Sequence, residues 1–327
     1  MYRITSDIAT FMHWPRVQPG DLSAGMVALG GVPIDVTGES QSQRFGPDAI
    51  RRASHLLHRY YVGEGQGGVV NVRTGRRMSD PVRREYVDVG NPEIWDTQLD
   101  RTNANIIEWM RLIVERGAFP IVLGGDHWTT APLFTGYHEA VRAAGQEYVG
   151  YIHVDAHLDL EESDHGDFWS GSTGVIIERL PGLRGENMVF LGQSAEVWQS
   201  EWDWITDHGA TLISADEVAE IGIEAAVSRA CEIAGRGTDS TYLTLDIDSI
   251  NTSDSPGAMS GATFWGLSAR EFARMVELMG ADASIGAVDF MEMAPDYDPH
   301  GTTAWFVARC VLGLLDERTR ARDGETT

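Results

Sequence analysis

The sequence predicts an α/β protein, with helices on both faces of a mostly parallel sheet in three α/β/α layers. Short apolar segments of strand length alternate with longer amphipathic segments, which is the pattern of parallel strands joined by helices. Acidic and histidine residues follow several of the apolar segments, and ligands of such sheets bind beyond the carboxyl ends of the strands. Neither an internal repeat nor a low-complexity linker divides the chain. We therefore expect one domain over residues 1–327, with an N-terminal arm at 1–25 and a flexible tail at 319–327.

The expected strands are short and apolar, and most of them end in polar or glycine-containing sequence. They cover residues 26–35, 86–90, 119–127, 151–159, 187–192, 209–213, 240–248 and 283–293. Two segments are expected outside the sheet. Phe11, Met12 and Trp14 of the arm are expected to dock on the body of the protein, and the Gly- and Arg-rich residues 63–84 are expected to form an exposed insertion.

The expected helices are indicated by amphipathic spacing and by the residues at their ends. They cover residues 48–58, 102–116, 131–144, 268–279 and 303–318. Pro47 suits the first turn of a helix, and Gly117 suits the end of one. Ser268 and Glu271 have the spacing of a capping box, which marks a helix start.

The composition limits the classes of function. A net charge of −24 argues against nucleic acid and anionic membranes as partners, and it favours the attraction of cations. Cys231 and Cys310 do not form a CxxC pair, which excludes a thiolate zinc site and suits a reducing compartment. The sequence shows no secretory signal pattern and no apolar run of about 18 residues. We therefore expect a cytoplasmic protein that binds neither nucleic acid nor membrane.

The most informative stretch is 151–159, which has the sequence of a buried strand that continues into polar residues. Side chains two positions apart share one face of an extended chain, so we expect Asp155, His157 and Asp159 to project together. An unpaired carboxylate is costly to bury, so such a cluster requires a cation nearby.

A second acidic pair and a further histidine extend this cluster. Asp246 and Asp248 repeat the two-residue spacing on another expected strand, and His127 follows a third. The two imidazoles and four carboxylates contain no sulfur donor and suit two hard or borderline divalent ions, whose charge the carboxylates balance. Water between two such ions loses a proton near neutral pH and becomes a nucleophile. The six residues therefore predict a dinuclear hydrolytic site.

The chain resembles the ureohydrolase family, which includes arginases and agmatinases. The resemblance rests on Gly124-Gly125-Asp126-His127, Asp155-Ala156-His157-Leu158-Asp159, Asp246-Ile247-Asp248 and Asp289-Phe290-Met291-Glu292-Met293-Ala294-Pro295, with weaker support from Gly31-Val32-Pro33-Ile34-Asp35, Arg44-Phe45-Gly46-Pro47 and Pro256-Gly257. It implies an arginase-like fold around an eight-stranded parallel sheet. It also implies a dinuclear site, usually of manganese, and assembly into trimers or hexamers.

The resemblance further implies a role for each site residue. One ion would be held by His127, Asp155, Asp159 and Asp246. The other would be held by His157, Asp155, Asp246 and Asp248, with Asp155 and Asp246 bridging. Glu292 would receive the guanidinium group of the substrate, and Asp159 would also hydrogen-bond the attacking hydroxide. The implied reaction is hydrolysis of a C–N bond at a guanidino carbon, with departure of an amine.

One departure from the family pattern concerns proton transfer. The family usually has a His–Gly pair after its second metal motif, and the histidine is thought to help proton transfer. A gap-free count from the strand at 187–192 places Ser170 at this position. His165 is the alternative, in a shorter loop.

A second departure concerns the substrate. The loop after the second motif is acidic and lacks the small polar residues that arginases use to hold an α-amino acid. Trp169 in this loop, together with Phe264 and Trp265 in a neighbouring loop, is expected to wall a compact cation. Ordinary packing is the alternative for these aromatic residues.

Together these features predict a metal-dependent hydrolase of a small cationic guanidine compound, namely guanidine, a substituted guanidine or a biguanide. The expected products are urea or a urea-like compound plus an amine, and the expected cofactors are two Mn(II) or Ni(II) ions. The alternatives are an agmatinase proper, a formimidoylglutamase-like hydrolase and a non-catalytic subunit of a mixed oligomer. A decayed subunit would be expected to lose metal ligands, whereas all six are present here. We expect a homo- or hetero-oligomer, a trimer or hexamer.

Overall fold

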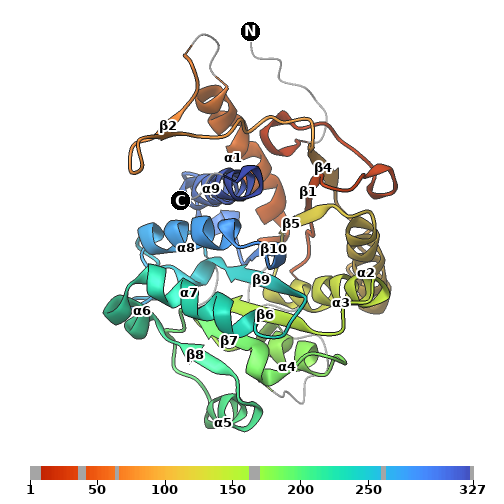
Figure 1. Cartoon of the computed structure of the whole chain (residues 1–327), viewed down its shortest axis with the longest axis vertical. Helices are drawn as coiled ribbons and strands as arrows, with labels where there is room; N and C mark the ends of the chain where they lie inside the picture. The colour runs from red at the N-terminus through yellow and green to blue at the C-terminus, as the bar shows by residue number, and fades with distance from the viewer. Residues whose placement is uncertain (1–8, 36–41, 63–65, 162–169, 259–262, 325–327) are drawn as a thin grey trace.

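One parallel sheet forms the middle layer of the protein. The computed structural model describes residues 9–35, 42–62, 66–161, 170–258 and 263–324, and in this part of the chain eight strands pair in the order β4-β1-β5-β10-β9-β6-β7-β8 (Figure 1). The strands are β1 (Val27–Gly31), β4 (Tyr86–Gly90), β5 (Phe119–Leu123), β6 (Val149–Val154), β7 (Met188–Leu191), β8 (Thr211–Ile213), β9 (Ser240–Asp246) and β10 (Ile285–Met291). Most of them are buried throughout because helices cover both faces, which explains their continuously apolar sequences. The predicted three-layer fold is confirmed.

The helices form two groups, one on each face of the sheet. One face is covered by α1 (Gly46–Tyr61), α6 (Ala215–Ile221), α7 (Ile223–Ala234), α8 (Ala269–Ala281) and α9 (Thr302–Asp323). The other is covered by α2 (Leu99–Glu115), α3 (Thr130–Ala143), α4 (Thr173–Glu178) and α5 (Gln199–His208). The predicted capping box is confirmed at the start of α8, where Ser268 Oγ accepts the N–H of Glu271 and the Glu271 side chain accepts the N–H of Ser268. None of the described helices is long and apolar enough to span a membrane.

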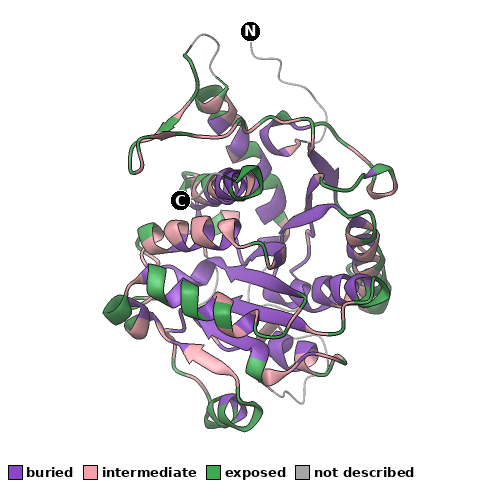
Figure 2. Cartoon of the chain, in the orientation of Figure 1, coloured by how far each residue is buried: buried purple, intermediate pink, exposed green. Residues whose placement is uncertain are grey.

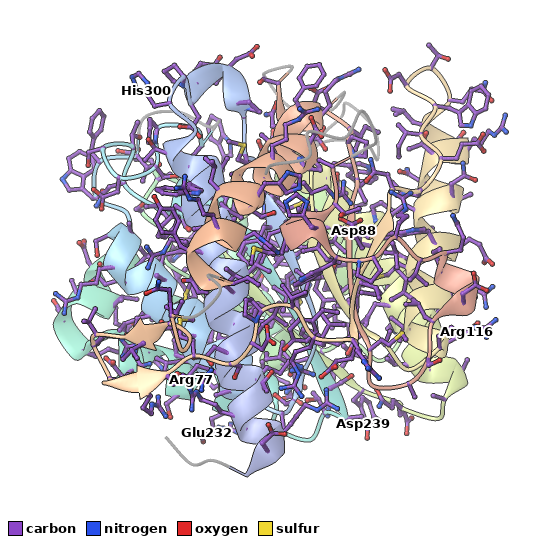
Figure 3. The ribbon with its side chains drawn as sticks, turned by 90° about the horizontal axis from the view of Figure 1, so that it is seen from above. Arg77, Asp88, Arg116, Glu232, Asp239 and His300 are labelled. Atoms are coloured by element: carbon purple, nitrogen blue, oxygen red, sulfur yellow. The ribbon has the colours of Figure 1, made fainter. Side chains whose placement is uncertain are left out.

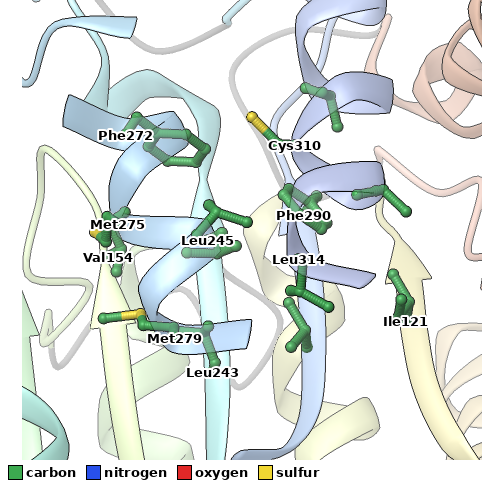
Figure 4. Close-up of a cluster of buried hydrophobic side chains, with 14 of the residues drawn as sticks. Ile121, Val154, Leu243, Leu245, Phe272, Met275, Met279, Phe290, Cys310 and Leu314 are labelled. Carbon is green, nitrogen blue, oxygen red and sulfur yellow. The ribbon is translucent and has the colours of Figure 1, made fainter. Parts of the chain in front are cut away.

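Each face of the sheet has its own hydrophobic core. Leu243 and Leu245 of β9 belong to one core, and Tyr242 between them belongs to the other, because alternate residues of a strand face opposite sides. Figure 4 shows the core that contains Leu243 and Leu245, to which α8 contributes Phe272 and Met279. Figure 2 shows the buried sheet between helices whose outward faces are exposed.

The segment predicted as an exposed insertion contains an anchored hairpin. Strands β2 (Val70–Asn71) and β3 (Arg76–Arg77) pair antiparallel. Arg76 Nη2 lies 3.2 Å from Glu317 Oε1 of α9, and the N–H of Ser79 donates to Asp316 Oδ1 at 2.7 Å. These partners are more than 200 residues away in sequence, so no local pattern could predict the anchoring.

The N-terminal arm docks on the body of the protein as predicted. Phe11, Met12 and Trp14 are buried. Asp88 of β4, which is fully buried and labelled in Figure 3, accepts the N–H of Phe11 at 2.9 Å and forms an ion pair with Arg51 of α1. The arm is therefore held by both apolar burial and a buried carboxylate.

The expected flexible tail at residues 319–327 overlaps the end of a helix. Helix α9 continues to Asp323. The hydroxyl of Tyr86 hydrogen-bonds Thr319 Oγ1 at 2.8 Å, and Arg320 is buried. The end of α9 is polar in sequence, and its partners come from distant strands, so its packing is invisible to hydrophobic periodicity.

Candidate metal centre

The predicted site residues meet at the carboxyl ends of four neighbouring strands. Strands β5, β10, β9 and β6 are adjacent in the sheet, and each leads into part of the site. His127 begins η4 (His127–Thr129) after β5, Glu292 follows β10, Asp246 ends β9, and residues 155–159 follow β6. Neighbouring parallel strands end at the same edge of a sheet, so motifs distant in sequence converge there.

The sequence predicted a strand over residues 151–159, but residues 155–159 do not continue the strand. Strand β6 ends at Val154, and the chain then bends, with Asp159 in the left-handed region at φ +52°. Asp155 Oδ1 accepts the N–H of His157 at 2.7 Å, which stabilises the bend. The side chains converge because the backbone curls around Asp155, and not because they alternate along a pleated strand.

A second bend replaces the predicted strand at Asp248. Strand β9 ends at Asp246, and the short helix η7 (Ile247–Ser249) follows. The N–H of Asp248 donates to Asp246 Oδ1 at 2.7 Å. Both acidic pairs thus use a carboxylate to cap the turn that brings the next ligand into place.

The first group of candidate ligands surrounds Nδ1 of His127. This atom lies 2.9 Å from Asp155 Oδ2, 2.9 Å from Asp246 Oδ2 and 3.2 Å from Asp159 Oδ2, and all four side chains are buried. His127 Nδ1 and Asp159 Oδ2 make no hydrogen bond of acceptable geometry. Buried polar atoms without partners are costly, and a cation between the ring nitrogen and the three oxygens would satisfy them together.

The second group of candidate ligands surrounds Nδ1 of His157. This atom lies 3.2 Å from Asp155 Oδ1 and 3.3 Å from Asp248 Oδ2. Asp155 therefore presents one oxygen to each group, as expected of a bridging carboxylate. Asp246 presents Oδ2 to the first group and uses Oδ1 to cap Asp248, so its bridging role stays a prediction. The side chain of His157 is 36% exposed, and this group meets solvent.

Without a bound cation, the pKa values of two residues in the cluster are raised, which favours their protonated forms. Burial alone would lower the pKa of His127, but contact with Asp155, Asp159 and Asp246 raises it well above its ordinary value. Burial and the charges of Asp248 and Asp155 raise the pKa of Asp246 well above its ordinary range. Metal binding displaces such protons. The sulfur-free donors, most of them buried, and the two atoms without hydrogen-bond partners therefore fit two divalent ions.

His153 is a site residue that the sequence analysis missed. Its Nε2 lies 3.0 Å from Asp155 Oδ2, and its Nδ1 lies 2.9 Å from the hydroxyl of Tyr151. The His153 ring also stacks on His127, with centroids 4.8 Å apart. The alternation of Tyr151, His153 and Asp155 along β6 was the available signal, since alternate residues share a face. This position suits His153 to orient the shared carboxylate of Asp155.

A hydrogen-bonded chain behind His127 fixes the orientation of its ring. Nε2 of His127 lies 2.9 Å from Thr244 Oγ1, and the hydroxyl of Thr130 lies 3.1 Å from both Thr244 Oγ1 and Asp289 Oδ2. Tyr242 donates to the same Asp289 oxygen at 2.6 Å. A proton on Nε2 leaves the lone pair of Nδ1 directed at the carboxylates. These contacts join residues of different helices and strands, so no local sequence pattern could predict them.

Glu292 is tightly constrained at the end of β10. Its backbone has φ +66°, and its N–H donates to the carbonyl of Gly125 at 2.9 Å. The N–H of His127 donates to Glu292 Oε1 at 2.6 Å, and Nε2 of Gln43 donates to Oε2 at 2.9 Å. Burial, followed by the charge of Asp126, raises the pKa of Glu292 to about 8. Gln43 is a second residue that the sequence analysis missed.

Ser170 lies beside the segment that carries His127. It begins η5 (Ser170–Ser172), and Thr173 Oγ1 donates to the carbonyls of Ser170 and His127 at 2.9 and 3.1 Å. The alternative, His165, lies outside the described residues.

The predicted aromatic wall receives no support from burial. Phe264 and Trp265 are 69% and 71% exposed and contact each other edge to face. The described part of the chain does not enclose them, so their contact with a substrate stays a prediction. Trp169 lies outside the described residues.

Comparison with known proteins extends over nearly the whole chain. The model of the arginase family matches residues 26–315. Guanidinobutyrase from Pseudomonas aeruginosa is 30% identical, with 94% of this chain and 91% of that protein covered. The structure of proclavaminate amidinohydrolase from Streptomyces clavuligerus has a TM-score of 0.80 at 25% identity, covering 97% of this chain and 98% of that one. A hypothetical agmatinase from Burkholderia thailandensis has a TM-score of 0.79 at 26% identity, with 97% and 93% covered.

Proposed function

The chain belongs to the arginase family, whose members are metal-dependent hydrolases of guanidino C–N bonds, and we propose that it hydrolyses a small cationic guanidine compound at a dinuclear centre. The proposed substrates are guanidine, a substituted guanidine or a biguanide, and the proposed products are urea or a urea-like compound plus an amine. Mn(II) and Ni(II) both suit the nitrogen and oxygen donors. Assembly into a homo- or hetero-oligomer remains part of the proposal.

One observation carries this proposal. Nδ1 of His127 and the carboxylate oxygens of Asp155, Asp159 and Asp246 converge in a buried group that leaves two of its atoms without hydrogen bonds. Beside it, His157 forms a second group through the other oxygen of Asp155. Two adjacent histidine–carboxylate groups that share a carboxylate match the needs of two ions close together.

The ligands would be divided as the family resemblance implies. One ion would be held by His127, Asp155, Asp159 and Asp246, and the other by His157, Asp155, Asp246 and Asp248. When bound, the ions would supply Lewis-acid chemistry that activates water and stabilises the oxygen that attacks the guanidino carbon.

The remaining roles belong to side chains around the ligands. Glu292 would accept N–H groups of the guanidinium, which orients the guanidino carbon toward the site. Asp159 would accept a hydrogen bond from the attacking water. Ser170 or His165 would pass a proton toward the departing amine. The buried position of Glu292 strengthens its interaction with a cation, since less water screens the pair.

The similarity to guanidinobutyrase supports a second candidate substrate, guanidinobutyrate. Guanidinobutyrate differs from the small cationic guanidines because it carries a carboxylate at the end remote from the guanidino group. A substrate panel therefore separates the two candidates.

The test is release of urea and amine by the isolated chain loaded with Mn(II) or Ni(II). The panel contains guanidine, methylguanidine, biguanide, agmatine, guanidinobutyrate, arginine and formimidoylglutamate. We expect cations without a carboxylate to have the highest kcat/KM. We also expect Glu292→Gln to lower kcat/KM by orders of magnitude at both low and high salt, because a buried charge pair is little screened. Arginine or formimidoylglutamate as the best substrate would contradict the proposal.

A further inference from the structure

We propose that Gln43 is a positioning residue that holds the carboxylate of Glu292 ready for one edge of a guanidinium group. The inference rests on the proposed function, because Glu292 must be the acceptor of the guanidinium. It adds a residue from the loop after β1 to a site whose other predicted members follow β5, β6, β9 and β10.

The amide of Gln43 has a defined orientation. Gln43 begins η3 (Gln43–Phe45) and is fully buried. The backbone N–H of Ser42 donates to Gln43 Oε1 at 3.1 Å, so Nε2 is the end of the amide that faces Glu292. Nε2 then donates to Glu292 Oε2 at 2.9 Å. With both ends bonded inside the protein, the amide cannot rotate without losing a buried hydrogen bond.

The turn at residues 42–46, which carries Gln43, is held against the segment after β10. Ser42 Oγ accepts the N–H of Asp296 at 3.0 Å. Gly46 approaches the carbonyl of Met293 so closely that an added Cβ would lie 2.5 Å from the carbonyl oxygen. Both contacts cross between the same two segments as the bond from Gln43 to Glu292. The amide donor is therefore placed by the fold and does not depend on a mobile side chain.

Gln43 and the backbone of His127 together determine which acceptor sites Glu292 offers. A carboxylate has about four lone-pair positions, two on each oxygen. The N–H of His127 takes one position on Oε1, and Gln43 takes one on Oε2. Within the described residues, one acceptor position remains on each oxygen. Two parallel acceptors match two N–H donors on different nitrogens of one guanidinium edge.

This arrangement defines the substrate class more narrowly. The edge that meets Glu292 must carry an N–H on each of two nitrogens, and substituents must lie on the far side. Methylguanidine meets this condition, whereas N,N,N′,N′-tetramethylguanidine, with N–H donors on a single nitrogen, does not. Both are cations, so the comparison separates edge recognition from simple charge attraction.

The experiment compares Gln43→Met with Arg44→Met in the metal-loaded protein. Met keeps the length of Gln43 and removes its N–H donor. Arg44 is the next residue in η3 and pairs with Asp35 and Asp96, so its replacement loosens the same turn at different contacts. The measurements are metal content, Tm, KM and kcat with the best guanidine substrate, and the inhibition constants of methylguanidine and tetramethylguanidine.

We expect Gln43→Met to raise KM roughly tenfold or more, since a hydrogen bond to a charged group contributes at least that factor. The change in kcat should be smaller, and metal content should match the unchanged chain. The preference for methylguanidine over tetramethylguanidine should shrink. Arg44→Met should lower Tm without changing this preference. Gln43→Asn, whose amide is too short to reach Glu292, should behave as Gln43→Met does and covers the case in which the Met variant does not fold.

Two outcomes would overturn the inference. An unchanged KM and preference in both Gln43 variants would show that the amide does not position Glu292. An equal loss of preference in Arg44→Met would show that only the integrity of the turn matters. In both cases, turnover of guanidines by the unchanged chain would leave the proposed function standing. If the unchanged chain hydrolyses none of the panel, the proposed function fails instead.

Discussion

The two histidine–carboxylate groups share Asp155 but differ in how the fold supports them. The group at His127 is buried, and the Thr244 hydroxyl and the ring of His153 hold the His127 imidazole in place. The group at His157 depends on two bends, one after β6 and one after β9, and its histidine is 36% exposed. The fold therefore preforms the group at His127, whereas the group at His157 depends more on local turns and on the bound ion.

Removal of the shared carboxylate of Asp155 should have the largest effect on metal content and activity, because both groups lose a ligand at once. Asp155→Asn leaves one neutral amide where each group needs a negative oxygen. We expect loss of both ions and a fall in kcat/KM by orders of magnitude, measured by elemental analysis and urea release. Asp203→Asn, on the exposed face of α5, is the control and should retain both ions. Full occupancy in Asp155→Asn would place the site elsewhere.

Removal of each histidine separately should expose the difference. His157→Ala should retain about one ion per chain, because the buried group keeps its full set of donors. His127→Ala removes the centre of the buried group and the imidazole that faces Asp159 and Asp246, so we expect a larger loss of metal and a lower Tm. Metal stoichiometry and thermal unfolding of the two variants are the measurements. Equal losses would mean that the groups are equally preformed.

A smaller loss of metal affinity or activity is expected when His153, which supports the shared carboxylate of Asp155, is replaced. His153→Phe keeps a buried ring but removes the hydrogen bond to Asp155. We expect metal affinity or activity to fall roughly 10- to 100-fold, as for other residues that orient metal ligands. A chelator titration and kcat/KM report the two quantities. The control is His208→Phe, which replaces a histidine of α5 whose ring stacks on Trp204. This variant should change neither metal affinity nor kcat/KM.

The smallest effect concerns pH in the chelated protein. The pKa of Glu292 is raised to about 8 from an ordinary value of 4.5. Between these values the folded state holds a proton that the unfolded chain has released, so stability falls as pH rises. The raised pKa of Asp246 acts in the same direction. We expect Tm to fall from pH 4.5 to 8, and Glu292→Gln to flatten the curve. A Tm that rises over this range would contradict the assignment.

The sequence predicted the fold and the convergence of the metal motifs because both depend on patterns within short segments. Apolar runs located the strands, and the carboxyl-end rule placed His127, Asp155 and Asp246 together. The same reasoning extended β6 through Asp159, since alternating polar and apolar residues imitate a strand. The left-handed backbone at Asp159 and Glu292 has no signature in non-glycine residues.

The supporting residues could not be predicted because their partners lie far away in sequence. Gln43 and Glu292 are 249 residues apart, and Thr130 and Asp289 are 159 apart. His153 is the exception, since its alternation with Asp155 was visible. A histidine beside a metal motif on the same strand face is therefore worth testing as a support for a ligand.

The position of β10 has a consequence for biosynthesis. This strand is the last in the chain, yet it lies in the middle of the sheet, between β5 and β9. Until β10 leaves the ribosome, the earlier strands can pair only within two separate sets, β4-β1-β5 leading to His127 and β9-β6-β7-β8 leading to Asp155 and Asp246. Long-range pairing of this kind is slow and leaves strand edges open in the meantime. The metal centre can therefore assemble only after translation is nearly complete, and chaperones have an interval in which to protect the incomplete sheet.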